Sequence, residues 1–452
     1  MAPSLRWGHF FMLSNWLIDT ELFAAPEDLS VFQKELPLEW IEQALEQTDK
    51  ASVRRRKLPA ELVVWLVVGI GLYRNRSISE VVSKLDLKMV NKLGDNVAPS
   101  AIPQARHRLT AQPLEALFNI TSHHWCQRED KTDLWHGLQL FSIDGTTLRC
   151  AENDEHSAHF GYISNQHKKH SVYPVARLCA LMSLRSRMIR DVKFGPCSSG
   201  EITYAKQLIQ SVPTNSLTIF DSCYFSAELM TNWHDEESHQ HWLTPLKSKT
   251  RYDVIEQYGD NDFLIEMPVS PQARKKNPTL PSKWQARLVT YKDKKQANHL
   301  SGILCSLTDT TKYPAQAILE VYFERWEIEN GYGEIKQYQL DENILLRSQT
   351  VEGIYQEIWG LLIAYNLIRV EISQIAKEAE VSPLRISFVM AMRYIQDELM
   401  WCAIASPGTI PKKLKAMRQN VKQFILPDKR KRPKSRTVRI SKTRYPIQRR
   451  NS

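Results

Sequence analysis

Four polar side chains in the segment 322–336 recur at a spacing that suits one face of a helix. They are a phenol, a guanidinium, a carboxylate and an ammonium, at Tyr322, Arg325, Glu329 and Lys336. At about 100° per residue, the four positions fall within an arc of about 60°. Leu319, Ile328 and Ile335 give the same helix an apolar side, so we expect it to pack and to present the polar face to a cleft. The alternative is a solvated surface on which Arg325 and Glu329 form an i,i+4 ion pair.

Two aspartates occupy a second kind of position that can do chemistry, directly after an apolar run typical of a strand. Asp144 follows residues 138–143, and Asp221 follows residues 217–220. In open α/β sheets, reacting groups gather where strands end, because loops expose side chains there while the strands hold them rigidly. An Asp at a strand end is also common as a turn or helix-cap residue, and this is the simpler interpretation of each aspartate taken alone.

The elements that must position these residues change in type along the chain. Residues 30–130 have the apolar spacing of short helices separated by Pro, Asn and Gly. Between residues 138 and 246, apolar runs predict three successive strands and then alternating helices and strands. This order predicts an α/β fold with a mixed sheet flanked by helices. Residues 247–310 contain short β-like runs that indicate an inserted β unit, and helices return at about 315–336 and 352–376.

The composition excludes several classes of protein. Of the 452 residues, 42% are hydrophobic and 24% are charged, as in ordinary folded proteins. The longest apolar run, residues 62–72, is too short to span a membrane, so we expect a buried helix. Asn15 and Asp19 interrupt the N-terminal apolar stretch, which argues against a secretory signal. The seven cysteines form no C-x-x-C pair, which argues against a disulfide framework or a cysteine zinc site and favours a reducing compartment.

Positive charge is concentrated near the C-terminus. Residues 412–452 contain 16 Lys and Arg and one acid, Asp428, so this tail carries +15; the whole chain carries +10, which leaves −5 for residues 1–411. A basic tail on a slightly acidic body indicates a polyanionic partner, nucleic acid first and an anionic membrane surface second. We expect the tail to be partly disordered and to bind phosphates without sequence specificity. A solubilising tail without a defined partner is the alternative.

The four polar residues of the helix coincide with a known signature. The segment 322–336 resembles the Y-x(2)-R-x(3)-E-x(6)-K signature of DDE transposases of the insertion-sequence-4 group. Residues 143–149 resemble the first-Asp segment of that family, and residues 220–226 resemble its second-Asp segment. Residues 346–348 and 357–369 resemble the helix that follows the signature.

The resemblance covers most of residues 30–410 and implies a domain organisation. The fold would be a ribonuclease-H-like mixed sheet flanked by helices, with a β-rich insertion, an N-terminal all-α domain and a basic C-terminal tail. The implied segments are a helical DNA-end-binding domain at 1–130, a catalytic domain at 131–246 and 311–405, an insertion at 247–310 and a tail at 406–452.

The resemblance also implies a role for individual residues. Asp144, Asp221 and Glu329 would form a catalytic triad that binds metal. The residues that contact the DNA end would be Tyr322, Arg325 and Lys336. The cofactor would be two Mg²⁺ ions, for which Mn²⁺ can substitute. Two such ions about 4 Å apart activate a water or a 3′-hydroxyl and stabilise the leaving oxygen of an in-line displacement. Mg²⁺ prefers oxygen ligands, so carboxylates and the scissile phosphate suffice to hold it.

Two features depart from the family pattern. Relatives usually carry a basic residue and Gly where this chain has Ser222 and Cys223. Several relatives use a Trp in the strand before the signature helix to hold a flipped base, whereas residues 299–304 contain none. Trp242 and Trp284 are candidate base-contacting residues in its place, although burial in the core is the simpler interpretation of each. A hairpin step in the reaction therefore stays open.

Basic and histidine residues elsewhere have competing interpretations. Residues 54–57, Arg106 and Arg108 lie at the edges of predicted helices, as in a small DNA-binding module or in a helical scaffold with solvated charges. Zinc is one interpretation of a set of four histidines, His156, His159, His167 and His170. Their polar segment has no neighbouring Cys spacing, which favours a DNA-facing or plain surface loop.

We therefore predict a DNA transposase that cuts and joins the terminal inverted repeats of an insertion sequence by metal-dependent, cut-and-paste transposition. Its partners would be double-stranded DNA, both as transposon ends and as target, and a second copy of the chain in the synaptic complex. We expect no membrane partner. We expect it in the bacterial cytoplasm, associated with the nucleoid when bound. The alternatives are a nuclease of the same fold that does not join DNA, and an inactive or domesticated derivative that only binds DNA.

Overall fold

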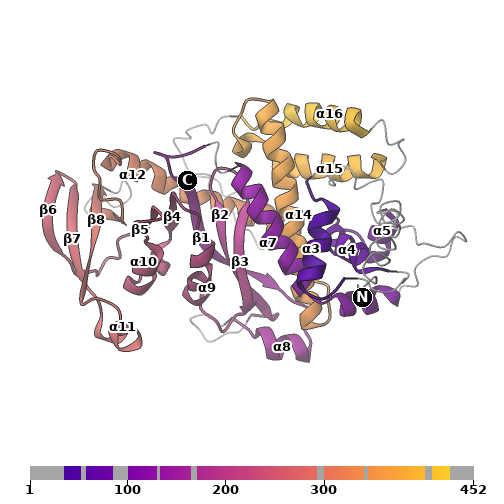
Figure 1. Cartoon of the computed structure of the whole chain (residues 1–452), viewed down its shortest axis with the longest axis horizontal. Coiled ribbons are helices and arrows are strands. Elements are labelled where there is room, and N and C mark those ends of the chain that lie inside the picture. The colour runs from indigo at the N-terminus through magenta and orange to yellow at the C-terminus, as the bar shows by residue number, and fades with distance from the viewer. Residues whose placement is uncertain are drawn as a thin grey trace, which may run out of the picture.

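The computed structural model contains one large sheet and a helical region beside it (Figure 1). The described residues are 35–51, 58–84, 100–129, 133–163, 171–292, 300–340, 345–402 and 410–427. Helix α14 (Val351–Glu378) lies where the sheet meets the helical region, and nearly all of its side chains from Ile354 to Ala376 are buried. The hydrophobic core is therefore continuous from the helical region to the sheet.

Five strands form the part of the sheet that holds the candidate site. They are β1 (Gln139–Arg149), β2 (Val175–Ser183), β3 (Ile189–Pro196), β4 (Ser216–Phe220) and β5 (Gln240–Pro245). Their spatial order is β3-β2-β1-β4-β5. The first three strands pair antiparallel, whereas β4 pairs parallel with β1 and with β5. The predicted mixed sheet is confirmed.

The predicted β-rich insertion is also confirmed, and it continues the same sheet. It contributes β6 (Asp253–Gly259), β7 (Asp262–Pro268), β8 (Lys283–Lys292) and β9 (Leu300–Cys305), with α11 (Pro271–Lys276) between β7 and β8. Strand β9 pairs antiparallel with β5, and β8, β7 and β6 follow in that order. The insertion therefore extends the five-stranded part of the sheet at the edge that β5 would otherwise leave open.

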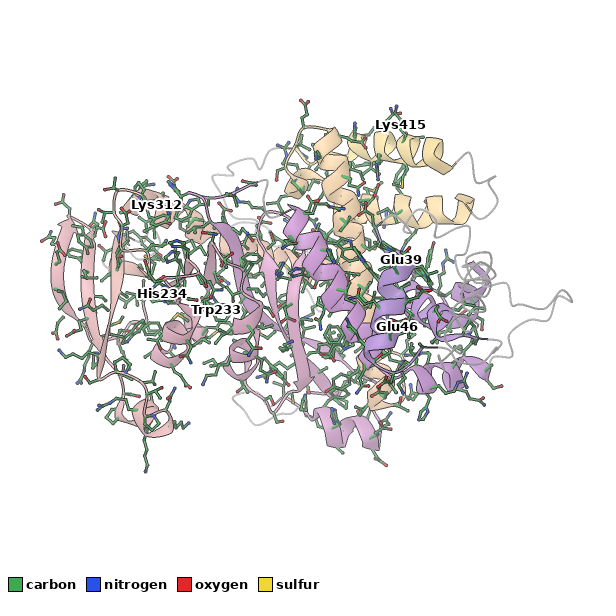
Figure 2. All side chains as sticks on the ribbon, in the orientation of Figure 1. Glu39, Glu46, Trp233, His234, Lys312 and Lys415 are labelled. Atoms are coloured by element: carbon green, nitrogen blue, oxygen red, sulfur yellow. The ribbon has the colours of Figure 1, made fainter. Side chains whose placement is uncertain are left out.

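Helices cover both faces of the sheet because successive strand residues point to opposite sides. On β2, Cys179 and Leu181 belong to the core under α9 (Glu201–Leu208) and α10 (Ala227–Trp233). Ala180 and Met182 belong to the opposite core, which α14 shares. Trp233, labelled in Figure 2, packs edge-on against Phe220 of β4 with ring centroids 4.8 Å apart. The candidate site residues therefore lie on strands that are fixed from both faces.

The N-terminal region contains short helices, as predicted. They are α3 (Leu38–Gln47), α4 (Ala60–Leu72), α5 (Ile78–Lys84), α6 (Ala101–Leu109) and α7 (Gln112–Glu129). Helix α4 is buried on all sides from Glu61 to Leu72, which confirms the buried helix expected from its apolar run. Among the described helices, none combines the length and apolar character needed to cross a membrane.

Helices α4 and α14 cross in direct backbone contact, and this contact leads to a prediction about stability. A Cβ added to Gly71 would lie 2.5 Å from the carbonyl oxygen of Gly360 and 2.9 Å from Cα of Leu361. We expect Gly71→Ala to lower the free energy of unfolding by about 1–3 kcal/mol, because the helices must separate. Gly333→Ala is the matched control, since its Cβ would meet nothing within 4 Å. Denaturant unfolding of both variants measures the effect, and equal stabilities would contradict this packing.

The start of the basic C-terminal tail is helical, which the sequence pattern did not predict. Helix α16 (Ile410–Val421) packs beside α15 (Phe388–Cys402), with Met417 and Val421 buried. Arg418 donates to Gln374 and Glu371 of α14, and Lys415, labelled in Figure 2, is exposed. The basic residues from 429 onward lie outside the described residues.

The signature segment forms several helical pieces, whereas the sequence pattern predicted one helix. Helix α12 (Ala315–Tyr322) leads into a 3₁₀ turn at Phe323–Arg325, then α13 (Trp326–Gly333), then a π-helix at Glu334–Gln339. A 3₁₀ turn and a π turn each change the angle per residue, so the ideal 100° spacing does not hold across the segment. Single π turns inside helices occur frequently at functional sites.

Candidate active site

Strand pairing brings Asp144 and Asp221 to neighbouring positions. Ile143 and Phe220 are the last partners in the parallel β1–β4 pairing, and the two aspartates follow directly. Asp221 begins the loop after β4, as predicted. The prediction that Asp144 ends its strand is wrong, because β1 continues to Arg149. The reason is its other neighbour, β2, which pairs with β1 from Phe141 through Arg149.

The third acid, Glu329, meets Asp221 through a shared arginine. Arg325 places Nη2 3.1 Å from Oε1 of Glu329 and Nη1 3.7 Å from Oδ2 of Asp221. The Arg325 side chain is only 10% exposed, whereas those of Asp221 and Glu329 are 41% and 36% exposed. The two carboxylates therefore face solvent above a buried guanidinium. The predicted i,i+4 pair of Arg325 and Glu329 is present, and it belongs to this site and not to an open surface.

Asp144 lies in a more enclosed environment than the other two acids. Its Oδ1 accepts a hydrogen bond of 2.8 Å from the N–H of Gly145. Burial raises the pKa of the Asp144 carboxyl to about 6, and the nearby carboxylates of Glu201 and Asp221 act in the same direction. The Gly145 N–H and the Arg325 guanidinium act against this shift. Proximity to Arg325 and Asp221 places Asp144 in the same electrostatic cluster as the other two acids.

The two remaining signature residues lie beside the acids. Burial raises the pKa of the Tyr322 hydroxyl, while the neighbouring Arg325 lowers it. Lys336, within the π-helix, places Nζ 3.4 Å from Oγ1 of Thr146 on β1. The structure thus brings the predicted polar residues of the helix to the same end of β1 and β4.

The arrangement has the donor chemistry of a divalent-cation site but is not a closed cage. Carboxylate oxygens are the ligands that hard divalent ions prefer; two of these groups contact one cation here, and the third, Asp144, is within its electrostatic influence. Within the described part of the chain, no three side chains of Asp, Glu, His or Cys are already close enough to hold one metal ion. The Arg325 guanidinium occupies the position between Asp221 and Glu329. The three acids therefore fit a metal by type, and Arg325 is the cation that Asp221 and Glu329 contact in this structure.

A buried ionic network fixes the signature helix, and the sequence analysis did not identify it. Arg187, in the turn between β2 and β3, pairs with Glu327 and with Glu334. Arg369 of α14 reaches Glu334 at 3.6 Å, and the hydroxyl of Tyr365 donates to Glu334 at 3.0 Å. Glu327 and Glu334 are seven residues apart, about two helical turns, and this spacing was the only local signal for them in the sequence. The network holds the helix that presents Glu329.

A fourth carboxylate near the site was also missed. Glu201 is the first residue of α9, and its Oε2 accepts a hydrogen bond of 3.3 Å from the hydroxyl of Tyr224. A Cβ added to Gly145 would lie 2.7 Å from Oε1 of Glu201, so the carboxylate packs against the residue after Asp144. No local spacing links Glu201 to Asp144 or Asp221, so only the folded sheet shows this proximity.

The candidate base-contacting tryptophans lie in the core. Trp242 and Trp284 are both buried in the cluster beneath α10 and the insertion, with ring centroids 5.6 Å apart. Exposed aromatic rings occur instead on the signature segment, where Phe323 is 59% and Trp326 is 56% exposed. The guanidinium of Arg325 lies 5.6 Å from the Trp326 ring. The sequence could have indicated these two aromatic residues, because they lie on either side of Arg325 in the signature.

The structure shows the contacts of two of the four histidines and of one of the N-terminal arginines singled out in the sequence. His156, on α8 (Asp154–Phe160), is buried and its Nδ1 lies 2.8 Å from the carbonyl oxygen of Ala151. His159 contacts the hydroxyl of Tyr355 at 3.2 Å. Arg106 donates to Gln356 and Ser348, so it joins α6 to the α14 region. His167, His170 and the basic run 54–57 lie outside the described residues.

Two family models and two curated relatives match the chain. Residues 26–119 match the family model described as insertion element 4 transposase N-terminal, and residues 135–367 match the transposase DDE domain. The transposase InsG for insertion sequence element IS4 of Escherichia coli (strain K12) is 34% identical over 409 residues, covering 90% of this chain and 91% of that protein. The putative transposase InsZ of the same strain is 35% identical over 232 residues, covering 51% of this chain and 76% of that protein.

Among solved structures, the piggyBac transposase synaptic complex with hairpin DNA is similar over 92% of this chain and 86% of that chain. The TM-score is 0.42 and the sequence identity is 13%.

The fold, the acids and the domain match together define the class of this protein. It is a DDE transposase with a ribonuclease-H-like fold, an enzyme of DNA transposition, and enzymes of this class use divalent metal ions. Within that class, the chain belongs to the insertion element 4 family, because both family models and most of its length match. The predicted family and function are confirmed.

Proposed function

We propose that Asp144, Asp221 and Glu329 are the catalytic triad and hold two Mg²⁺ ions, for which Mn²⁺ can substitute. The observation that supports this most is the shared Arg325 guanidinium, which gathers Asp221 and Glu329 around one positive centre near Asp144. A site that already concentrates oxygen donors around a cation meets the main requirement of a hard metal ion. Bound there, the ions supply Lewis acidity to the scissile phosphate and an activated hydroxyl nucleophile.

The chain's own residues then orient the DNA and the acids. Asp144, on β1, and Asp221, directly after the neighbouring β4, keep their carboxylates at a fixed separation while the phosphodiester is positioned. Arg325 and Lys336 are suited to phosphate recognition, Arg through its planar fork and Lys as a point charge. Tyr322 lies beside Arg325 and completes the proposed DNA contact. When Arg325 turns to a phosphate, it leaves Asp221 and Glu329 free to bind metal.

The exposed aromatic residues extend the proposed DNA contact. Phe323 and Trp326 present rings to solvent beside the triad, whereas the rings of Trp242 and Trp284 are buried. Stacking of a nucleic-acid base on such a ring is worth about 1–3 kcal/mol. We therefore assign base contact to Phe323 and Trp326 in preference to the two buried tryptophans.

The reaction implies that the protein works as an assembly with DNA. Cut-and-paste transposition brings two DNA ends together, so we propose a homodimer in the synaptic complex with double-stranded DNA. The helical region 1–130 and the insertion at 247–310 would read the ends, while 131–246 with 311–405 cuts and joins. The basic tail, 406–452, would add affinity for phosphates.

A transposition assay with purified full-length protein tests this function. The substrate is linear DNA carrying the inverted repeats that flank its reading frame, with a supercoiled target plasmid and Mg²⁺. We expect cleavage at the ends and joined products, both lost when the ions are chelated. Cleavage without joined products would support the nuclease instead. Binding without cleavage in Mg²⁺ or Mn²⁺ would support the inactive derivative.

A further inference from the structure

Tyr332 is a buried tyrosine whose hydroxyl reaches the backbone at the first aspartate. It lies on α13, three residues after Glu329, and packs in the core with Ile328 and Ile335. Its hydroxyl donates a hydrogen bond of 2.6 Å to the carbonyl oxygen of Asp144 and accepts one of 3.3 Å from the N–H of Ala180. A tyrosine hydroxyl has one donor and acceptor capacity, so it can make both bonds.

These bonds join three elements at the level of the candidate site. Asp144 on β1 and Ala180 on β2 are register partners, and Tyr332 contacts the backbone of both. Residues three apart on a helix lie on one face, so Glu329 and Tyr332 are presented together. The separation between the Glu329 helix and the Asp144 strand is therefore set at this hydroxyl.

The same contact bears on the orientation of the Asp144 carboxylate. The carbonyl of Asp144 and the N–H of Gly145 belong to one planar peptide unit. Tyr332 holds the carbonyl end, and the N–H end donates to Oδ1 of Asp144 at 2.8 Å. Fixing the plane from the carbonyl side thus fixes the donor that orients the carboxylate. Burial raises the pKa of the Tyr332 hydroxyl well above its usual range, so it remains a donor.

The helix needs such an anchor because α13 is short. A 3₁₀ turn precedes it and a π-helix follows it, so its register does not derive from one long regular helix. The helix also lies very close to the sheet, since a Cβ added to Gly331 would lie 2.6 Å from Sδ of Met182. Glycine at 331 leaves room for the Met182 side chain of β2, and the hydroxyl of Tyr332 reaches the backbone of β1 and β2.

We propose that Tyr332 is a positioning residue that sets the separation and orientation of Glu329 and Asp144, and so the closure of the metal site. This inference rests on the proposed triad. It predicts that loss of the hydroxyl weakens metal binding more than it weakens folding. The substitution Tyr332→Phe removes one oxygen and keeps the ring in the core.

The test compares Tyr332→Phe with Tyr73→Phe in the full-length chain. Tyr73 is a second buried tyrosine, whose hydroxyl donates to the carbonyl oxygen of Gln396 at 3.1 Å, in the helical region. Cleavage of end DNA is measured against Mg²⁺ concentration, and thermal unfolding is measured without metal. For Tyr332→Phe we expect the half-saturating Mg²⁺ concentration to rise about tenfold, the effect of one lost hydrogen bond, with recovery at high Mg²⁺ or in Mn²⁺. For Tyr73→Phe we expect a similar loss of unfolding temperature and an unchanged Mg²⁺ requirement.

Three outcomes distinguish a failure of this inference from a failure of the proposed function. If the parent chain cleaves with Mg²⁺ and both variants share its Mg²⁺ requirement, Tyr332 has no positioning role. If Tyr332→Phe loses cleavage in proportion to its loss of folded protein, its role is structural only and the inference is overturned. If the parent chain shows no metal-dependent cleavage, the proposed function itself fails.

Discussion

Asp144→Asn removes cleavage and joining of DNA while leaving the fold and DNA binding intact. The substitution keeps the shape of the side chain and removes a proposed metal ligand. Metal ions contribute several kcal/mol of charge stabilisation in such reactions, so we expect the cleavage rate to fall on the order of 10³-fold or more. Rates are measured on pre-bound end DNA, and binding is measured separately by mobility shift.

Measuring the stability of Asp144→Asn tests whether misfolding causes its loss of cleavage. Burial raises the pKa of Asp144 from 3.8 to about 6, so above pH 6 the folded protein holds a charge that burial disfavours. Asn removes that charge, and the metal-free variant should be at least as stable as the parent at pH 7. Glu320→Gln is the matched control, an exposed carboxylate on α12 that accepts from Gln316. An active Asp144→Asn enzyme would contradict the proposed triad.

Arg325→Gln has effects of opposite sign on metal binding and on catalysis. In the metal-free protein, Arg325 contacts both Asp221 and Glu329, and a hydrogen bond to a charged group is worth about 1.5–3 kcal/mol. Without that competitor, we expect Mg²⁺ to bind at least about tenfold more tightly. Cleavage should fall on the order of 10³-fold, because the guanidinium that we propose to stabilise the reacting phosphate is lost. Calorimetric titration with Mg²⁺ and single-turnover cleavage measure the two effects.

Arg325→Lys is the control for charge alone. It keeps a cation at the site but cannot contact both carboxylates through a planar fork. We expect both its Mg²⁺ affinity and its cleavage rate to lie between those of the parent and those of Arg325→Gln. Weaker Mg²⁺ binding by Arg325→Gln would show that Arg325 supports the metal site and does not compete with it.

Most of the sheet could be predicted from the sequence because its strands are apolar runs. The parts that could not be predicted depend on contacts between distant segments. Strand β1 continues past Asp144 because β2 pairs with it, and no local pattern shows that pairing. The helix at 410–421 was missed because basic residues dominate it, although Met417 and Val421 have helical spacing.

The parts of the candidate site that depend on spacing within one segment could be predicted from the sequence. The signature predicted Glu329 beside Arg325, and that pair is present at 3.1 Å. The ideal helical angle could not predict the 3₁₀ turn before α13 or the π turn at Lys336, because both depart from regular α-helix. Glu201 and Tyr332 reach the Asp144 segment only through the tertiary fold.

The most direct test is to locate the metal ions. Crystals of the full-length protein with uncleaved end DNA and Mn²⁺ would show the ions by anomalous scattering. The account predicts two peaks about 4 Å apart, with oxygens of Asp144, Asp221 and Glu329 as ligands and Arg325 turned away from the two acids it contacts here. Mn²⁺ bound elsewhere, or bound without these three carboxylates, would contradict it.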